Sequence, residues 1–569
     1  LQPFVDRHFG EDFPCLKYTL AQRADALPPN VRVEEFYLQS GAQLDSAQSQ
    51  QDYSSLNYTH VARTVAAHGV NVLVQKVARE PGGTRLSLSC NPDLTFDLLD
   101  EIARLGKPRP LVVAEVDPHL PWLGGSACAP EGFFDLVIDL PGTAPKLFAL
   151  PRQPVGDADY AIGLRASALV RDGGTLQIGI GSLSDAICHG LILRHTRNEE
   201  YRLLLEALAP GYAESELVHR IGGVEPFRVG LYGASELVND GFMRLAQAGI
   251  LRRRVLDDVE AMRRIGDNQA TEEDRRRLET EGRWLDGGFY LGSGELYDWL
   301  RSLPDEQRRG IGMTRISHIN ELYGGNEALE RLQRRDARFF NSCMMMTALG
   351  AAVSDALADG RVVSGVGGQY NFVAMAHALR DGRSVLMFRA VREARGIAAS
   401  SVLWNYGHCT IPRHLRDIVI TEYGVADLRG QSDSEVVKRL IAVADSRFQE
   451  ELIRQAKAHG KLEADYVLPE RYRHNLPEML EEKLHPWAQA GLLPDFPFGT
   501  DLTEDELHIV RALKKLKHAT QHPGELLTMA IKSLWETKEA PLPYLERLGL
   551  AETHSFKDAF VKRLLANNL

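Results

Sequence analysis

Two glycine clusters lie where a predicted strand passes into a predicted helix, a position where backbone groups can bind an anion. The first, Gln177–Ser182, contains Gly179 and Gly181, and the second, Ser364–Gln369, contains Gly365, Val366, Gly367, Gly368 and Gln369. Glycine lets the backbone approach a ligand closely, and N–H groups at a helix start favour anionic atoms or a developing oxyanion. Neither cluster continues as a Walker phosphate loop or as a full GxGxxG dinucleotide pattern. Each is also compatible with a tight turn that binds nothing.

Longer motifs surround both clusters. The stretch VVSGVGGQYNFVAMAHAL at 362–379 contains the second cluster, and GGTLQIGIGSLSDAI at 173–187 contains the first. Val419–Gly430 reads VITEYGVADLRG, and the shorter motifs EVDPHLP, GLYGASELVNDGF and GSGELYDWL also occur. In their order along the chain, these motifs resemble those of the acetyl-CoA hydrolase and 4-hydroxybutyrate CoA-transferase family. The resemblance extends from Tyr37 to Leu462.

This resemblance implies chemistry on CoA thioesters. Members of the family attack an acyl-CoA with a glutamate, which gives an acyl-glutamyl anhydride and then a glutamyl-CoA thioester. Amides of the glycine loop hold the oxyanion, and transfer to a carboxylate or to water completes the cycle. The resemblance implies an acyl-CoA hydrolase or CoA-transferase for a small carboxylic acid, with coenzyme A or its thioester as substrate and no metal. Glu236 and Glu422 belong to the family pattern and are expected to have structural or CoA-positioning roles.

The sequence departs from the family at the strand where we place the family's glutamate. Here it reads Asn341-Ser342-Cys343-Met344-Met345-Met346-Thr347. Matching the Asn-Ser pair and the later Gly350 puts Met345 at the glutamate position. A thioether cannot form the anhydride. In a strand, Cys343 and Met345 point to the same face, so an apolar patch replaces the charged nucleophile.

Three alternatives follow from this departure. First, another carboxylate reaches the same place, and Glu321 in the turn-rich segment HINELYGG is the leading catalytic candidate, although it also suits a solvated loop. Second, Cys343 is the nucleophile, with His318 or His408 as its base, although a buried cysteine among methionines is usually inert. Third, covalent catalysis has been lost, and the protein activates water or binds CoA thioesters without turnover.

One basic residue is a candidate for binding the phosphates of CoA. Arg413 matches a later arginine of the family, and a guanidinium fork suits phosphate, although surface arginines are common. An earlier family arginine is replaced by Ser401. His408 and His414 are not spaced with other ligands as a metal site requires.

The composition describes an ordinary folded protein and excludes several classes. The chain has 569 residues, a formal net charge of −11 and 44% hydrophobic residues. The acidic balance disfavours nucleic-acid partners, and no apolar run reaches the roughly 20 residues of a membrane helix. Its six cysteines form no CxxC pair, which is typical of free thiols in a reducing compartment. The sequence starts with Leu1, so any leading segment is invisible. We expect a cytoplasmic protein that forms a homo-oligomer, a dimer.

Short β-rich runs alternate with helical segments, the signature of an α/β fold with mostly parallel sheets. Strands are predicted at Val70–Val77, Leu111–Val116, Phe134–Asp139, Leu176–Ile180, Phe339–Thr347, Arg361–Val363, Ser384–Arg389 and Asp417–Thr421. Helices are predicted at Ala158–Val170, Ala348–Leu357, Tyr370–Leu379, Asp433–Ala456, Thr503–Leu516, Pro523–Glu536 and Ser555–Leu565.

These elements predict two CoA-transferase-like α/β domains, at 1–228 and 229–483, with the CoA thioester bound between them. A charged helical insertion is expected at about 252–284, and a small α-helical extension at 484–569. The alternative function is a catalytically silent protein that binds CoA thioesters on the same fold. The two functions differ in one observable feature, since a catalyst needs a carboxylate or an activated thiol within reach of the Gly365–Gln369 loop.

Overall fold

The computed structural model describes residues 2–10, 13–140, 142, 144–323, 325–394, 396–521, 529, 540–548, 550, 552 and 556–568. The chain forms two compact units. One unit joins Leu1–Pro14 to Gly499–Leu569, and the other is Cys15–Phe498. The sheets of the described residues, and both glycine clusters, belong to the Cys15–Phe498 unit.

An eight-stranded sheet forms the centre of the larger unit, in the order β17-β16-β12-β9-β5-β6-β7-β8. Its strands are β5 (Thr175–Gln177), β6 (Tyr232–Val238), β7 (Leu285–Tyr290), β8 (Ile311–Met313), β9 (Ala337–Ser342), β12 (Arg383–Met387), β16 (Ile418–Thr421) and β17 (Gly424–Asp427). Every neighbouring pair is parallel except β16 and β17. The predicted α/β class with mostly parallel strands is therefore confirmed.

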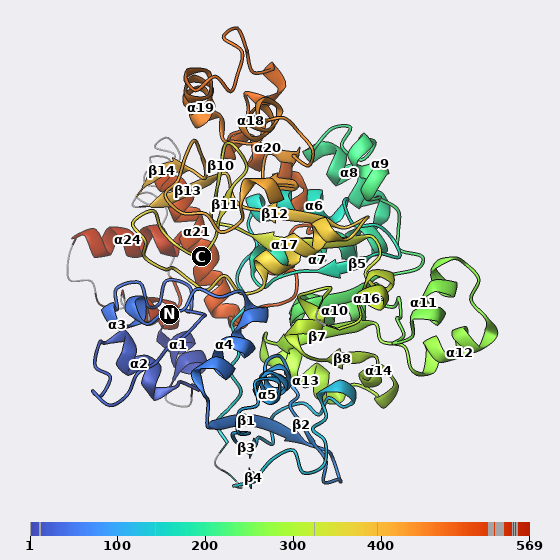
Figure 1. Cartoon of the computed structure of the whole chain (residues 1–569). Helices are drawn as coiled ribbons and strands as arrows, with labels where there is room; N and C mark the ends of the chain where they lie inside the picture. The colour runs from blue at the N-terminus through green and yellow to red at the C-terminus, as the bar shows by residue number, and fades with distance from the viewer. Residues whose placement is uncertain are drawn as a thin grey trace. The chain divides into compact units, whose positions relative to one another are not determined.

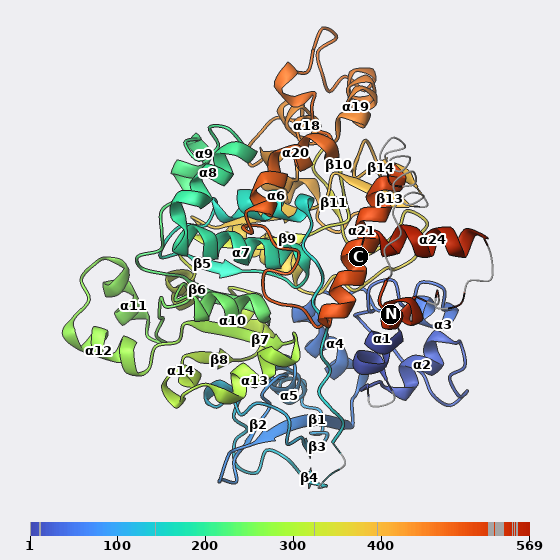
Figure 2. The ribbon, with the colours of Figure 1, turned by 180° about the vertical axis from the view of Figure 1, so that it is seen from behind.

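Helices cover both faces of this sheet. Adjacent residues of β9 point to opposite faces, so Phe340 joins the cluster that contains Ile187 while Phe339 packs with Phe372. Ile187 belongs to α7 (Ser182–Thr196), which packs with α6 (Asp157–Ser167), and Phe372 belongs to α17 (Gln369–Ala378). Figure 1 shows α17 in front of the strands, and Figure 2 shows α6 and α7 from behind. The long apolar runs predicted as strands follow from this burial on both faces.

A smaller sheet has the order β2-β1-β3-β4, and the last three of these strands are parallel. Its strands are β1 (Val72–Arg79), β2 (Leu86–Ser87), β3 (Leu111–Val116) and β4 (Leu136–Ile138). Helices α4 (Val61–His68) and α5 (Thr95–Arg104) bury one face, where Leu73 packs against Ala66 and Ile102. The three strands predicted in this region are confirmed, with ends shifted by a few residues.

Three predictions from β9 onward are wrong. The strand predicted at Phe339–Thr347 is two strands, because the chain leaves the large sheet and forms β10 (Met345–Thr347) between β11 (Ala352–Val353) and β15 (Val402–Leu403). The helix predicted at Ala348–Leu357 is absent, because Gly350, at φ +91°, turns the chain so that Ala352 pairs with Met346. The small residues there resemble a helix but fill a turn. Arg361–Val363 forms only an isolated bridge, from Val362 to Ala356.

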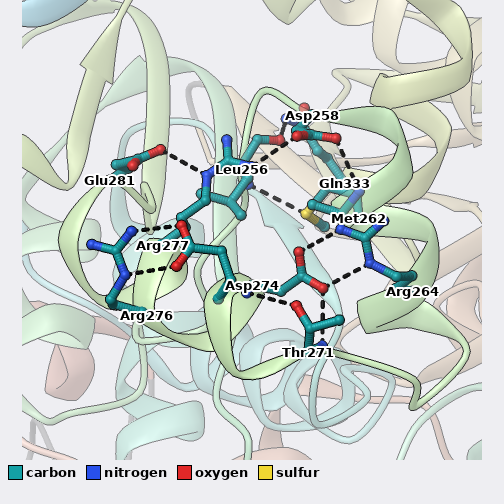
Figure 3. Close-up of polar contacts among 12 residues, drawn as sticks. Leu256, Asp258, Met262, Arg264, Thr271, Asp274, Arg276, Arg277, Glu281 and Gln333 are labelled. Atoms are coloured by element: carbon teal, nitrogen blue, oxygen red, sulfur yellow. Dashed lines mark hydrogen bonds and ion pairs between the residues drawn. The ribbon is translucent and has the colours of Figure 1, made fainter.

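The charged insertion is helical, as predicted, with α11 (Val259–Gly266) and α12 (Glu272–Thr280). Ion pairs hold the two helices together, and the Arg264 guanidinium lies 2.6 Å from the Asp274 carboxylate (Figure 3). Its inner side is apolar, because Leu256 and Met262 pack with Leu329 of α16 (Glu327–Gln333). The insertion therefore packs against α16 through an apolar side and exposes a charged side to solvent.

The rest of the larger unit is mainly helical. It contains α2 (Lys17–Arg23), α3 (Ala47–Gln51), α8 (Asn198–Leu208), α9 (Glu216–Ile221), α10 (Asp240–Gln247), α13 (Gly294–Ser302), α14 (Asp305–Arg309), α15 (Ile316–Ile319), α18 (Asp433–Ala442), α19 (Ser446–Ala458), α20 (Pro477–Gln489) and the hairpin β13 (Val391–Ala394) and β14 (Ile397–Ser400). The helix predicted at Asp433–Ala456 is two helices, because Asp445 caps the start of α19 by accepting a hydrogen bond from Arg447 N.

The smaller unit consists of α1 (Gln2–Phe9), α21 (Glu504–Gln521), α23 (Leu542–Arg547) and α24 (Phe556–Ala566) among its described residues. The helices predicted at Thr503–Leu516 and Ser555–Leu565 are confirmed, whereas Pro523–Glu536 lies outside the described residues apart from position 529. No helix of the described chain is long and apolar enough to span a membrane. The predicted domain limits at 228 and 483 remain predictions.

Candidate functional site

The second glycine cluster leads directly into α17 and lies against a carboxylate. A Cβ atom added to Gly368 would lie 1.9 Å from Glu236 Oε2 and 2.1 Å from Asn320 Nδ2. A Cβ atom on Gly365 would lie 2.6 Å from the Phe36 carbonyl oxygen. Glycine leaves room at these two positions for side chains and backbone of other segments that approach the loop.

Glu236 is the carboxylate that reaches this loop. It lies on β6, where Asn320 Nδ2 donates to its Oε2 at 2.6 Å and the Gly368 N–H faces its carboxylate. Burial raises the pKa of Glu236 to about 7, and the nearby Asp93 adds to this shift. These hydrogen bonds work in the opposite direction and favour the ionised form. Glu236 is only partly buried, and so are the loop residues before Gly368.

A ring of contacts positions this carboxylate. Tyr58 donates its backbone N–H to the Gly367 carbonyl oxygen at 3.3 Å, and its hydroxyl donates to Asp93. The Asp93 carbonyl oxygen accepts from Ile316 N at 2.8 Å, at the start of α15, and Asn320 immediately follows that helix. The fully buried Asn320 then closes the ring on Glu236. Burial also raises the pKa of Asp93 to about 6.

The first glycine cluster is tied to the same strand. Ser235, the neighbour of Glu236 on β6, donates its hydroxyl to the Ile178 carbonyl oxygen at 3.1 Å, and Asn239 donates its amide to Gly179 O. Gly181 has φ +109°, a conformation that favours glycine, and it caps α7. Ser235 of β6 therefore contacts the first glycine cluster, and the next residue, Glu236, contacts the second.

The residues proposed as nucleophiles from sequence lie in different surroundings. Glu321 directly follows Asn320 and is partly buried. The Arg334 guanidinium donates to the Glu321 carbonyl oxygen at 3.0 Å. No hydrogen bond or ion pair in the described chain joins Glu321 to the second loop. Met345 is 5% exposed in a sheet away from β9. Cys343 is buried in an apolar cluster, and this burial raises the pKa of its thiol.

One of the proposed bases, His408, and the proposed phosphate ligand are engaged elsewhere. One ring nitrogen of His408 lies 2.9 Å from Asp355 Oδ1, with Thr410 on the same oxygen. Arg413 is half exposed and pairs with Asp433 at 3.2 Å. No described contact brings Arg413 to either glycine loop. Among the residues that the structure describes, no cluster of His, Cys, Asp and Glu is arranged to hold a metal ion.

Glu422, the other glutamate of the family motifs, is buried beside the end of β12. It accepts a hydrogen bond from Ala390 N at 2.7 Å, and burial raises its pKa to about 7. Sequence reasoning missed Asn320, Asp93 and Tyr58. Of these, Asn320 had a signal, since it lies in the same polar turn as Glu321.

Similarities to known proteins point in one direction. Residues 292–456 match the acetyl-CoA hydrolase/transferase C-terminal domain. The chain is 24% identical over 348 residues to the 4-hydroxybutyrate coenzyme A transferase of Clostridium kluyveri, covering 61% of this chain and 65% of that protein. It is 28% identical over 172 residues to a probable butyrate:acetyl-CoA coenzyme A-transferase of Syntrophomonas wolfei, covering 30% and 36%. The aligned part spans less than two thirds of either relative.

Solved structures show the same fold. RipA from Yersinia pestis superposes with a TM-score of 0.54 at 21% identity, covering 72% of this chain and 76% of that chain. A 4-hydroxybutyrate CoA-transferase from Porphyromonas gingivalis superposes with a TM-score of 0.50 at 20% identity, covering 73% and 82%. At this identity the likeness concerns the fold alone.

Proposed function

This chain belongs to the acetyl-CoA hydrolase and CoA-transferase family, and we propose that it cleaves the acyl-CoA thioester of a small carboxylic acid with Glu236 as nucleophile. The observation that carries the proposal is the position of the Glu236 carboxylate, next to Gly368 and hydrogen-bonded by Asn320. This is the carboxylate within reach of the loop that a catalyst requires. Glu236 thus replaces Glu321 as our candidate nucleophile.

The chemistry follows from the surroundings of Glu236. Its ionised carboxylate attacks the thioester carbonyl, a C–O bond forms, the C–S bond breaks, and CoA leaves as the thiolate. CoA thiolate then attacks the glutamyl carbonyl of the anhydride and releases the original acid, which leaves a glutamyl-CoA thioester. An acceptor carboxylate takes the CoA by the reverse steps, or water hydrolyses the intermediate. A pKa near 7 keeps Glu236 more basic than an ordinary carboxylate and still about half ionised at neutral pH.

Backbone donors of the glycine loop complete the site in this proposal. The amides from Val366 to Gly368 lie at the start of α17, and the partly exposed loop admits a substrate. Preorganised N–H groups stabilise the oxyanion that forms when the thioester carbonyl is attacked. Cytoplasmic location, assembly as a homo-oligomer and phosphate binding by Arg413 remain predictions from the sequence.

The test is release and transfer of CoA by Glu236→Gln and Glu321→Gln, assayed with a panel of short acyl-CoAs and carboxylate acceptors. Loss of a covalent nucleophile is expected to lower kcat by at least about 10³-fold in Glu236→Gln. The Glu321→Gln variant changes a carboxylate one position from Asn320, and it is expected to keep wild-type turnover. Full activity in Glu236→Gln would refute the assignment. Binding of CoA thioesters by the wild type without any release would instead favour the silent, CoA-binding alternative.

A further inference from the structure

A cavity of about 1240 Å³ lies in the larger unit, and no residue of either glycine cluster lines it. Loops of the small sheet, the α14–β8 segment, α15, α16 and the charged insertion all contribute to it. Neither Glu236 nor any residue of the Gly365–Gln369 loop lines it. The proposed catalytic site therefore does not account for this cavity.

The insertion gives the cavity a prebuilt wall. Arg277 pairs with Asp258 at 2.8 Å, and Gln333 Nε2 donates to the Leu256 carbonyl oxygen at 2.9 Å (Figure 3). On the cavity lining itself, Arg283 pairs with Asp257 at 2.6 Å and with Asp286 at 2.7 Å. These guanidinium and carboxylate groups are already satisfied by one another, so the wall keeps its shape without a ligand.

Two ionisable side chains of the lining have room for further hydrogen bonds. Glu330 is only 6% exposed, and its Oε2 lies 3.6 Å from the Arg334 guanidinium but has no hydrogen-bond partner in the described chain. The His318 ring also makes no hydrogen bond with the described residues. A Cβ atom added to Gly325 would lie 3.1 Å from Glu330 Oε1 and 3.2 Å from His318 Nε2, so the Glu330 carboxyl and the His318 imidazole are neighbours. Burial raises the pKa of Glu330 to about 7 and lowers that of His318. The ion pair with Arg334 offsets part of the cost of burying the Glu330 carboxyl, and a hydrogen bond from a ligand would offset more.

The same cavity offers aromatic surface and basic groups. Phe96 and Trp122 line it, with the Arg315 guanidinium 5.4 Å from the Phe96 ring centroid and the Arg85 guanidinium 5.7 Å from the Trp122 ring. Arg308 donates to the Leu303 carbonyl oxygen at 2.6 Å and pairs with Asp305 at 3.1 Å, while its buried Nε has no hydrogen-bond partner among the described residues. The neighbouring Arg309 is exposed, and no ion pair is recorded for it within the described ranges.

We propose that this cavity binds an adenine nucleotide group. The adenine edge presents an amino donor next to a ring-nitrogen acceptor, which matches the carboxyl of Glu330 beside the imidazole of His318. Phe96 and Trp122 offer aromatic faces for the base, and the exposed Arg309 offers a guanidinium group for its phosphates. The nucleotide group has two possible sources, which are a free adenine nucleotide and the nucleotide end of CoA.

Calorimetric titration of the full-length protein with ADP, 3′,5′-ADP, adenosine and inorganic phosphate tests the proposal. Removal of a hydrogen bond to a buried ionisable group is expected to weaken ADP binding about tenfold in Glu330→Ala. Glu327→Ala, on the same helix but outside the lining, is the matched control and is expected to bind as the wild type does. Arg309→Ala changes an exposed residue, so its fold is safe, and it is expected to weaken ADP several-fold without affecting adenosine.

The proposal is wrong if neither nucleotide binds at millimolar concentration, or if Glu330→Ala and Arg309→Ala both bind ADP like the wild type. Competition identifies the source. If CoA displaces ADP, and Arg309→Ala raises KM for an acyl-CoA, the nucleotide end of CoA occupies the cavity. If ADP binds equally well to the CoA-saturated protein, the ligand is a free nucleotide. The inference does not rest on the proposed function, since Glu236→Gln is expected to bind ADP normally even if that function fails.

Discussion

Replacement of Gly368 by alanine perturbs the contact on which the catalytic proposal depends. The added Cβ would lie 1.9 Å from Glu236 Oε2, whereas real Cβ contacts stay above 3.0 Å, so the carboxylate must move by at least about 1.1 Å. A misplacement of about 1 Å costs on the order of 10²-fold in rate. The clashing atoms are the ends of two side chains, so the free energy of unfolding is expected to fall by only about 1 kcal/mol.

The assay compares kcat for CoA release with the thermal midpoint of unfolding, for Gly368→Ala and for Gly266→Ala. Gly266 is the last residue of α11, and a Cβ there would meet nothing within 4 Å, so the control is expected to keep the wild-type rate and to lose no stability. The account predicts a large loss of rate with a small loss of stability in Gly368→Ala alone. A wild-type rate in that variant would show that the carboxylate does not lie against the loop during turnover.

The remaining predictions concern pH and single side chains. Because Glu236 must be ionised to attack and its pKa is about 7, the rate of CoA release is expected to rise with pH through about 7. The same raised pKa means that the folded state holds its proton longer than the unfolded state, so this group lowers stability as pH rises from about 4.5 to 7. Glu236→Gln should lack that decline in denaturant titrations at several pH values, and an unchanged profile would contradict the burial. Cys343→Ser is expected to keep CoA release, since burial holds the thiol protonated, and a loss of release without unfolding would restore the cysteine mechanism. Thr271 and Asp274 form a capping box at the start of α12, so Thr271→Ala should lower the free energy of unfolding by about 1 kcal/mol in urea titrations, and no change would contradict the cap.

The sequence was informative where local pattern decides structure. Strand β3 and helix α17 follow from local hydrophobic pattern, and the clusters at Gly181 and Gly368 mark real turns before helices. The segment Ala348–Leu357 failed because its small residues suit both a helix and a tight hairpin. Pairing of Met346 with Ala352 decides between them.

The arrangement of the site could not be predicted in the same way. Glu236, Asn320 and Gly368 are far apart in sequence, and the order of parallel strands together with α15 brings them together. Anchoring the family glutamate on Asn341-Ser342 directed attention to Met345, which instead lies in a small buried sheet. A single polar residue in a strand carries no local signal of the backbone that it will face.

The most direct test of the central claim is a trapping experiment on the wild type, Glu236→Gln and Glu321→Gln. Each protein is mixed with acyl-CoA and treated with borohydride, which reduces a glutamyl thioester, and the modified residue is then mapped by peptide mass analysis. The account predicts a permanent mass change on Glu236 in the wild type and in Glu321→Gln, and none in Glu236→Gln. A label on Glu321 or an acyl group on Cys343, or CoA release that continues in Glu236→Gln, would contradict it.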